Sequence, residues 1–181
     1  CLARASADDA AAQFDTATNM TDRFEALVVL AHHFPDEPAT RRALDAFFER
    51  FRDDELVLDK WFTVQASAPH EGAIDDAERL SRHPAFRLSN PNRARALIGG
   101  LASSNPRAFN RADGAGYRFA AGKLAELDAL NPQTAARLAN AFRSFRMMEP
   151  GRRAQAAAAL ESLRSKQLSK DLQDIVVRTL Q

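Results

Sequence analysis

The sequence predicts an all-α protein, and three observations carry this prediction. Alanine is abundant, with 36 residues against three Ile and six Val, a composition that favours helices over strands. Apolar residues recur every three or four positions along most of the chain, and no window of the sequence sustains the alternation typical of a strand. Asn-Pro pairs and other turn signals interrupt this pattern at short intervals. We therefore expect about nine or ten helices joined by short turns.

The predicted helices follow one another along the chain, and each is marked by an apolar stripe. Residues three, four or seven positions apart lie on one helical face, so a stripe marks the face that a helix buries. In chain order the stripes are Phe24–Ala31, Leu44–Phe51, Leu58–Gln65, Ala94–Leu101, Leu124–Leu130, Leu138–Phe145, Leu160–Leu163 and Leu172–Thr179.

Three Asn-Pro pairs predict where helices begin. The Asn side chain can accept a hydrogen bond from a free N–H of the first turn, and the Pro that follows has no N–H to leave unpaired. Asn90-Pro91, Asn105-Pro106 and Asn131-Pro132 are therefore predicted helix starts. His83-Pro84 and Glu149-Pro150 predict that one helix stops and another begins, because the residue before a proline is driven out of the α region.

Glycines predict two further features of the backbone. The segment Asp113–Gly116 (DGAG) is typical of a turn, here placed ahead of a helix that carries Tyr117 and Phe119. Gly99-Gly100 interrupts a helical stripe, at a cost of about 1 kcal/mol per Gly relative to Ala. This pair predicts either a close contact between two helices or a kink.

Short helices of this kind bury their stripes by stacking as antiparallel pairs, in a bundle or in a solenoid. The Asn-Pro signals lie 15 and then 26 residues apart, so the chain shows no strict repeat. We therefore expect an irregular α-superhelix, an armadillo/HEAT-like solenoid, with residues 1–181 forming a single helical domain. The chain begins within a helical pattern and without an initiator Met, so we expect it to be part of a longer protein.

Charge is distributed unevenly, although the net charge is only +1. Residues 1–60 hold seven basic and 13 acidic side chains, whereas residues 61–181 hold 18 basic and 11 acidic ones. The segment Arg79–Arg118 contains eight Arg and one acidic residue, Asp113. It is either a solvated polar face or a basic surface that meets an anion, a carboxylate or an acidic neighbouring domain. The low total charge argues against a dedicated nucleic-acid-binding protein.

The sequence also bears on compartment and assembly. Cys1 is the single cysteine, which allows no internal disulfide and is typical of a reducing compartment, so we expect a cytoplasmic location. The longest aliphatic run, Ala26–Ala31, is too short to span a bilayer, and no charged-then-apolar leader opens the chain. We expect no membrane partner, no nucleic acid and a monomer.

No catalytic motif is complete in this sequence. His70-Glu71-Gly72-Ala73-Ile74 has Ile where a zinc peptidase helix needs its second His ligand. His32 and His33 are adjacent, so they point to different helical faces; they fit the last turn of a helix better than a metal site. Cys1 has no recognisable nucleophile setting, and no nucleophile elbow, phosphate loop or dinucleotide motif is present. We therefore expect no catalytic residue, no metal site and no cofactor in this chain.

Six segments resemble, in the same order, the C-terminal helical domain of the bacterial aminopeptidase N family, zinc metallopeptidases of the gluzincin group. They are Asn19–Arg23 (NMTDR), Asp59–Pro69 (DKWFTVQASAP), Ser89–Gly100 (SNPNRARALIGG), Ser104–Phe109 (SNPRAF), Asp113–Phe119 (DGAGYRF) and Asn131–Leu138 (NPQTAARL). The resemblance implies a parent enzyme that removes N-terminal residues from peptides, with one zinc held in an upstream catalytic domain of the same chain. It implies that the helical domain is itself non-catalytic, caps the catalytic domain and narrows access to its site.

The resemblance also assigns three substrate-binding residues. Gln133 matches a residue at the wall of the pocket for the substrate's first side chain, and Arg137 and Arg95 match arginines that face the inner cavity. The alternatives are an exposed first-turn polar residue for Gln133 and surface or interdomain salt bridges for the two arginines. Gln133 and Arg137 are four residues apart and share a helical face, so we expect all three to lie on one concave surface with accessible polar ends.

Two other functions fit the same residues. The main alternative is a free-standing α-solenoid that binds a protein partner on its concave face. A further alternative is an anion- or nucleic-acid-binding protein that uses Arg79–Arg118.

Overall fold

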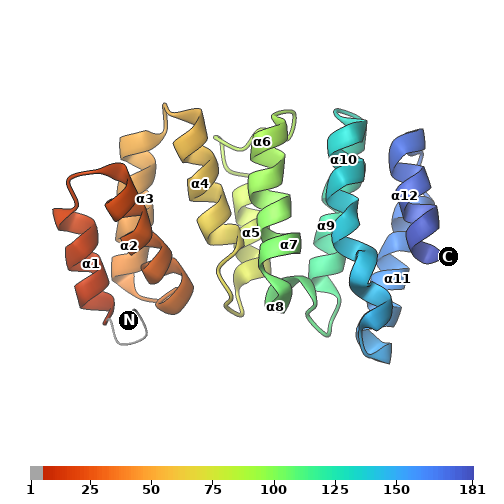
Figure 1. Ribbon diagram of the computed structural model, residues 1–181, viewed down its shortest axis with the longest axis horizontal. Helices are drawn as coiled ribbons and strands as arrows, with labels where there is room; N and C mark the ends of the chain where they lie inside the picture. Colours follow the sequence, from red (N-terminus) through yellow and green to blue (C-terminus); the bar gives the residue numbers. More distant parts are fainter. Residues whose placement is uncertain (1–5) are drawn as a thin grey trace.

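A computed structural model describes residues 6–181, and helices hold most of them (Figure 1). Within this part of the chain there is no strand, and the predicted all-α class is confirmed. The helices are α1 Ala7–Thr16, α2 Met20–His33, α3 Pro38–Phe51, α4 Glu55–Ala66, α5 Ala73–Ser81, α6 Pro91–Ala94, η2 Arg95–Gly99, α7 Gly100–Ser104, α8 Pro106–Phe109, α9 Ala115–Asp128, α10 Pro132–Ala139, η3 Asn140–Met147, α11 Pro150–Arg164 and α12 Lys170–Leu180.

Two of these helices change their winding along their length. The segments α6, η2 and α7 follow one another without a break, and η2 is a π-helix. In the same way α10 continues directly into η3, a 3-10 helix. Counted as continuous rods, residues 6–181 form ten helices of nine residues or more and the single turn α8, in agreement with the expected number.

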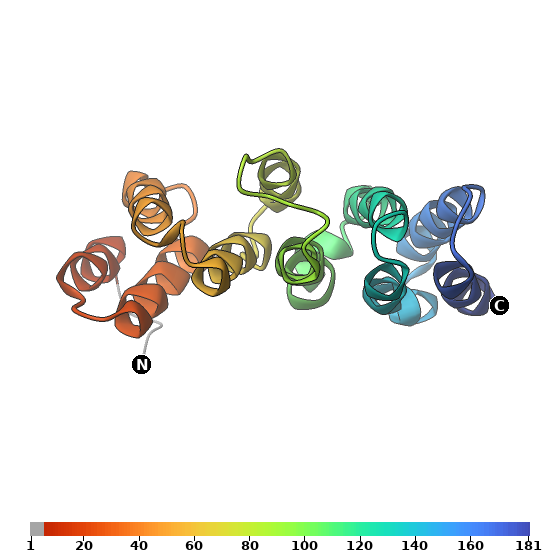
Figure 2. The ribbon, with the colours of Figure 1, turned by 90° about the horizontal axis from the view of Figure 1, so that it is seen from above.

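The helices stack in two layers to form a solenoid, as predicted (Figure 2). One layer contains α2, α4, the α6–α7 rod, α10 and α12, and the other contains α1, α3, α5, α9 and α11. Consecutive helices run in opposite directions, so the helices of one layer are parallel to each other and begin at the same edge of the molecule. For the first layer this is the upper edge in Figure 1.

Two hydrophobic clusters hold the layers together, and the α6–α7 rod contributes to both. The first cluster joins α1–α5 and includes Leu97 and Leu101 of the rod, whereas the second joins α9–α12 and includes Ala94 and Ile98. Fully burying a large apolar side chain contributes about 1.5–3 kcal/mol. The rod therefore links the two halves of the solenoid through two adjacent faces of a single helix.

The Asn-Pro pairs begin helices as the sequence predicts. Asn90 Oδ1 accepts hydrogen bonds from the N–H groups of Asn92 (2.9 Å) and Arg93 (3.3 Å). Asn105 and Asn131 cap their helices in the same way, through the third residue that follows each of them. Glu149 caps α11 with its carboxylate, which explains why a helix restarts at Pro150.

The two predicted glycine features differ in kind. Gly114 has φ +74°, a left-handed conformation that favours glycine, and it forms the expected turn ahead of α9. Gly100 marks a close contact between two helices rather than a kink: a Cβ at this position would lie 3.0 Å from Cβ of Ala66 in α4.

No helix among residues 6–181 has the length and apolar composition that a membrane span requires.

Candidate functional site

The three residues assigned by resemblance lie on two neighbouring helices of one layer. Arg95 is the first residue of η2, and Gln133 and Arg137 are on the first two turns of α10. Both helices begin at the upper edge in Figure 1, so all three residues lie near that edge. All three side chains are exposed. The two rods touch one turn below Arg95, because a Cβ on Gly99 would lie 3.3 Å from Cδ2 of Leu138.

The local structure of α10 explains how Gln133 and Arg137 are presented. Asn131 Oδ1 accepts a hydrogen bond from the N–H of Thr134 at 3.0 Å and fixes the start of the helix. Thr134 and Ala135 are buried, which turns the opposite face of the first turn to solvent. Gln133 and Arg137 therefore project from one exposed face on consecutive turns, the spacing at which helical side chains are neighbours.

These polar groups are available to a ligand. Among the described residues, no ion pair involves Arg95 or Arg137, and the side chains of Gln133 and Arg137 form no hydrogen bond within the chain. Arg95 donates one hydrogen bond, from Nη2 to Asn92 Oδ1 at 2.5 Å. A guanidinium carries five N–H donors, so most of the hydrogen-bonding capacity of Arg95 is unused. The substrate-binding role of the three residues remains a prediction.

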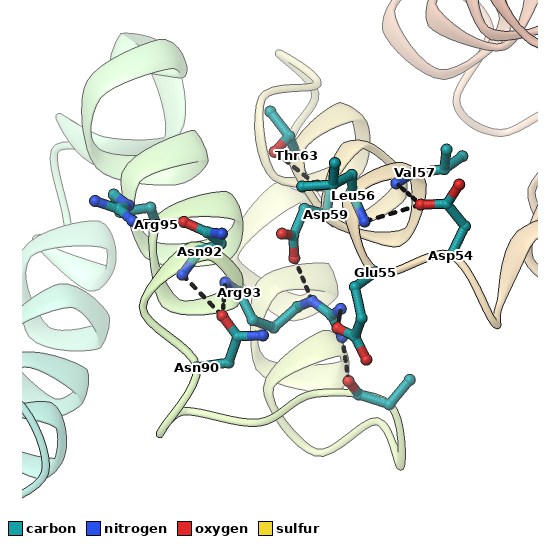
Figure 3. Close-up of polar contacts among 11 residues, drawn as sticks. Asp54, Glu55, Leu56, Val57, Asp59, Thr63, Asn90, Asn92, Arg93 and Arg95 are labelled. Carbon is teal, nitrogen blue, oxygen red and sulfur yellow. Dashed lines mark hydrogen bonds and ion pairs between the residues drawn. The ribbon is translucent and has the colours of Figure 1, made fainter.

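Arg93 is the most highly connected polar residue near this edge, and the sequence analysis missed it. Its side chain is only 2% exposed. Nε donates to Asp59 Oδ1 at 2.5 Å, Nη2 donates to Glu55 Oε2 at 2.7 Å, and Nη1 donates to the carbonyl oxygen of Ala85. The guanidinium also lies 5.0 Å from the ring centroid of Phe62, within reach of a cation–π interaction. Figure 3 shows Arg93 reaching α4 while Arg95 points away from it.

A signal in the sequence could have found this cluster. Arg93 lies four residues before Leu97 and eight before Leu101, so it continues the stripe that faces the first hydrophobic cluster. A charged residue is almost never fully buried unless it is paired, so an Arg on a core-facing stripe predicts acidic partners. Asp59 lies two residues before Trp61 on α4, and it was one candidate for the acidic partner of Arg93.

The histidines occupy structural positions within the described residues. His70 Nε2 lies 3.2 Å from Asp76 Oδ2, and this hydrogen bond is the main cause that holds the pKa of Asp76 below its ordinary value. His32 Nε2 lies 3.2 Å from both the carbonyl oxygen of Val64 and the hydroxyl of Ser67. His32 and His33 form the last turn of α2, as expected. Residues 6–181 contain no group of three His, Cys, Asp or Glu side chains able to hold a metal ion, and Cys1 lies outside the described residues.

Comparison with protein families shows which family this solenoid belongs to. A family model described as "Domain of unknown function (DUF3458_C) ARM repeats" matches residues 2–181. The chain belongs to this family. The ARM repeats of the family agree with the two-layered solenoid and with the armadillo-like superhelix predicted from the sequence.

Relatives of this ARM-repeat chain are aminopeptidases. Aminopeptidase N of Escherichia coli is 38% identical over 93% of this chain, and aminopeptidase N of Haemophilus influenzae is 37% identical over 93%. A crystal structure of Legionella pneumophila aminopeptidase A in complex with aspartic acid matches 96% of this chain with a TM-score of 0.90 and 30% identity. The chain spans 19% of the length of the two curated relatives and 20% of the Legionella chain. These findings indicate a C-terminal domain of aminopeptidase N, as the resemblance implies.

Proposed function

We propose that this chain is the non-catalytic helical domain of a cytoplasmic zinc aminopeptidase, which removes N-terminal residues from peptides. In this role the solenoid caps the catalytic domain of the same polypeptide, narrows the path of the substrate, and supplies part of the pocket wall. The observation that carries the proposal is the similarity to aminopeptidase N over 93% of the chain. The exposed side chains of Arg95, Gln133 and Arg137 lie near one edge of the solenoid, on neighbouring helices. They support the proposal that this edge forms the pocket wall.

The residues that the structure describes do not fit a catalytic zinc. Such a site needs three protein ligands and one open position, and no group of three candidate ligands exists among residues 6–181. In the HEGAI segment, Ile74 takes the place of a second histidine and is buried in the first hydrophobic cluster. In the proposed enzyme the upstream catalytic domain holds the zinc, as the resemblance implies, and no step through the metal is assigned to residues 6–181.

The three exposed residues have the chemistry that a peptide-binding wall requires. The amide of Gln133 can both donate and accept hydrogen bonds, so it can pair with a polar group of the substrate. Arg95 and Arg137 can bind a carboxylate with two parallel hydrogen bonds, the geometry that guanidinium groups favour. A peptide has one terminal carboxylate, and we assign Arg95 and Arg137 to its recognition.

The alternative of an anion- or nucleic-acid-binding surface has less support. Five of the eight arginines in Arg79–Arg118 form ion pairs with carboxylates, and these are Arg79, Arg82, Arg93, Arg107 and Arg111. Most of the positive charge of the segment is thus neutralised locally. A polyanion needs several free cations along one face, because each neutralised phosphate contributes to affinity.

Substitution of Gln133 in the full-length protein tests the proposal. Gln133→Ala should change the ratio of kcat/KM values between two N-terminal residues of different size by about tenfold, with the free energy of unfolding almost unchanged. Gln173→Ala is the matched control, since Gln173 is an exposed glutamine near the start of α12. Equal selectivity in the two variants would remove Gln133 from the pocket wall. A full-length gene without an upstream H-E-x-x-H motif would instead favour the free-standing solenoid.

A further inference from the structure

Arg93 and Arg95 are two residues apart, yet the rod buries one and exposes the other. Arg93 is 2% exposed and bonds to two carboxylates of α4 and to the carbonyl oxygen of Ala85. Arg95 is exposed and bonds only to Asn92, three residues before it. Among the side-chain hydrogen bonds of α6, those of Arg93 are the ones that reach another helix or the segment between α5 and α6. Arg93 therefore ties the short segment α6 to the rest of the solenoid (Figure 3).

The π-helix that follows Arg93 determines which way the side chains on each face of the rod point. An α-helix has 3.6 residues per turn, so positions four apart drift around the axis, whereas the wider π-turn offsets this drift. In this rod the faces repeat every four residues. One buried face holds Ala94, Ile98 and Ala102 in the second cluster, and another holds Arg93, Leu97 and Leu101. A third face holds the exposed Arg95 and Ser103 and the half-buried Gly99, which faces Leu138 of α10.

The direction in which the Arg95 side chain points therefore depends on η2 keeping its π-helical winding. Within the four residues of α6, the buried side chains that hold it against rotation about the rod axis are those of Arg93 and Ala94. If η2 closed to α-helical winding, the residues before it would rotate by about 100° relative to α7, since each residue of an α-helix advances by that angle. Arg95 would then leave the line of Gly99, which faces Leu138 of α10.

We propose that Arg93 is a positioning residue for Arg95: it anchors the turn ahead of the π-helix and so holds Arg95 on the edge shared with Gln133 and Arg137. This inference rests on the proposed function, in which Arg95 meets the carboxylate of the peptide. Arg93 itself touches no substrate, because its guanidinium is enclosed by Glu55, Asp59 and Ala85.

The test uses the full-length protein with Arg93→Lys, Arg95→Ala and the double variant. Lysine keeps the charge of Arg93, but a single ammonium group cannot reproduce the planar fork that reaches three acceptors. KM and kcat are measured on a tripeptide and on its C-terminal amide, and a crystal structure of the Arg93→Lys variant records the position of Arg95. Arg153→Lys is the matched control, since Arg153 is an exposed arginine on α11, in the other layer.

The expected result has three parts. Arg95→Ala raises KM about tenfold more for the tripeptide than for the amide, as the loss of a charged hydrogen bond predicts. Arg93→Lys shows the same selective rise, and the double variant shows no further rise because both substitutions act through one group. In the crystal structure of Arg93→Lys, Arg95 has moved away from the edge that it shares with Gln133 and Arg137.

The outcomes that overturn the inference differ from those that overturn the proposed function. An unmoved Arg95 in the Arg93→Lys crystal, or additive effects in the double variant, overturns the positioning role of Arg93. No selective rise in KM for Arg95→Ala overturns the substrate role of Arg95, and the crystal structure still decides whether Arg93 positions it. If Arg93→Lys does not fold, Asp59→Asn takes its place, because it removes one charge of the cluster and keeps the acceptor oxygen.

Discussion

The carboxylate of Asp128 is buried at the end of α9 and holds Ser169, the cap of the last helix. It accepts hydrogen bonds from the N–H of Ser169 at 2.6 Å and from its hydroxyl at 2.5 Å. Asp128 is 5% exposed, so both bonds lie in a region of low dielectric where a charged acceptor is strong. Ser169 in turn accepts from the N–H of Leu172 and caps α12. One buried carboxylate therefore joins the end of α9 to the cap of α12, through two residues that lie 41 positions apart in the chain.

Asp128→Asn should lower the free energy of unfolding by about 1–3 kcal/mol. The amide keeps the shape of the side chain, but it replaces a charged acceptor of two bonds by one acceptor and one donor. Urea denaturation measures the loss, and Asp174→Asn, an exposed carboxylate on α12, should change stability by less than about 0.5 kcal/mol. Equal effects of the two variants would show that Asp128 does not secure α12.

Asn90→Ala should cost about 0.5–2 kcal/mol, because the N–H groups of Asn92 and Arg93 lose their acceptor while Pro91 still sets the helix entry. Ser89→Ala, at the exposed residue just before the cap, is the control and should be almost neutral. A denaturation midpoint that stays constant in Asn90→Ala would contradict the capping role.

Two glycine substitutions within helices should act in opposite directions. A Cβ at Gly100 would lie 3.0 Å from Cβ of Ala66 and 3.6 Å from the carbonyl oxygen of Thr63, so Gly100→Ala should destabilise the chain by about 1–3 kcal/mol. A Cβ at Gly122, on α9, would meet no atom within 4 Å, and Gly122→Ala should stabilise by about 0.4–1 kcal/mol. A gain of stability in Gly100→Ala would mean that the rod and α4 can separate at little cost.

Much of the fold was predictable because it follows from local rules. The helix starts at Asn90, Asn105 and Asn131 depend on residues within three positions, and apolar spacing alone indicates which face is buried. The layered stacking follows from short turns between helices of similar length. Resemblance then supplied the family, which periodicity alone did not.

The π-turn and the Arg93 cluster were not predictable in the same way. The sequence of residues 95–99 is typical of an ordinary helix, whereas the structure shows π-helical winding in a rod that packs against two hydrophobic clusters. The partners of Arg93 lie 34 and 38 residues away, so only the fold reveals the pairing. Gly100 shows the same limit: its sequence position left open a kink or a close contact, and the distance to Ala66 decides for the contact.

Acidification should destabilise the chain through His32. This residue is half-buried, and burial lowers its pKa from the ordinary value of 6.5; the neighbouring His33 and His70 lower it further, although the hydrogen bond to Val64 raises it. The folded state therefore keeps His32 neutral at a pH where the unfolded chain already binds a proton. The unfolded state binds more protons than the folded state in this window. The contribution of His32 to the free energy of unfolding is therefore fully present above pH 6.5 and is lost as the pH falls from 6.5 through the folded pKa.

His32→Gln should therefore flatten the dependence of unfolding free energy on pH just below neutrality, where one such group contributes at most about 1.4 kcal/mol per pH unit. Glutamine can still donate to the carbonyl oxygen of Val64, so the packing of α2 against α4 is kept while the titration is removed. A smaller slope should persist, because burial also lowers the pKa of His83. The control is His33→Gln, at an exposed position next to His32; it leaves the buried imidazole of His32 in place, so it should change the slope much less than His32→Gln does. If His32→Gln and the unaltered chain lose stability in parallel between about pH 7 and pH 5, His32 binds protons equally in the folded and unfolded states and burial does not keep it neutral.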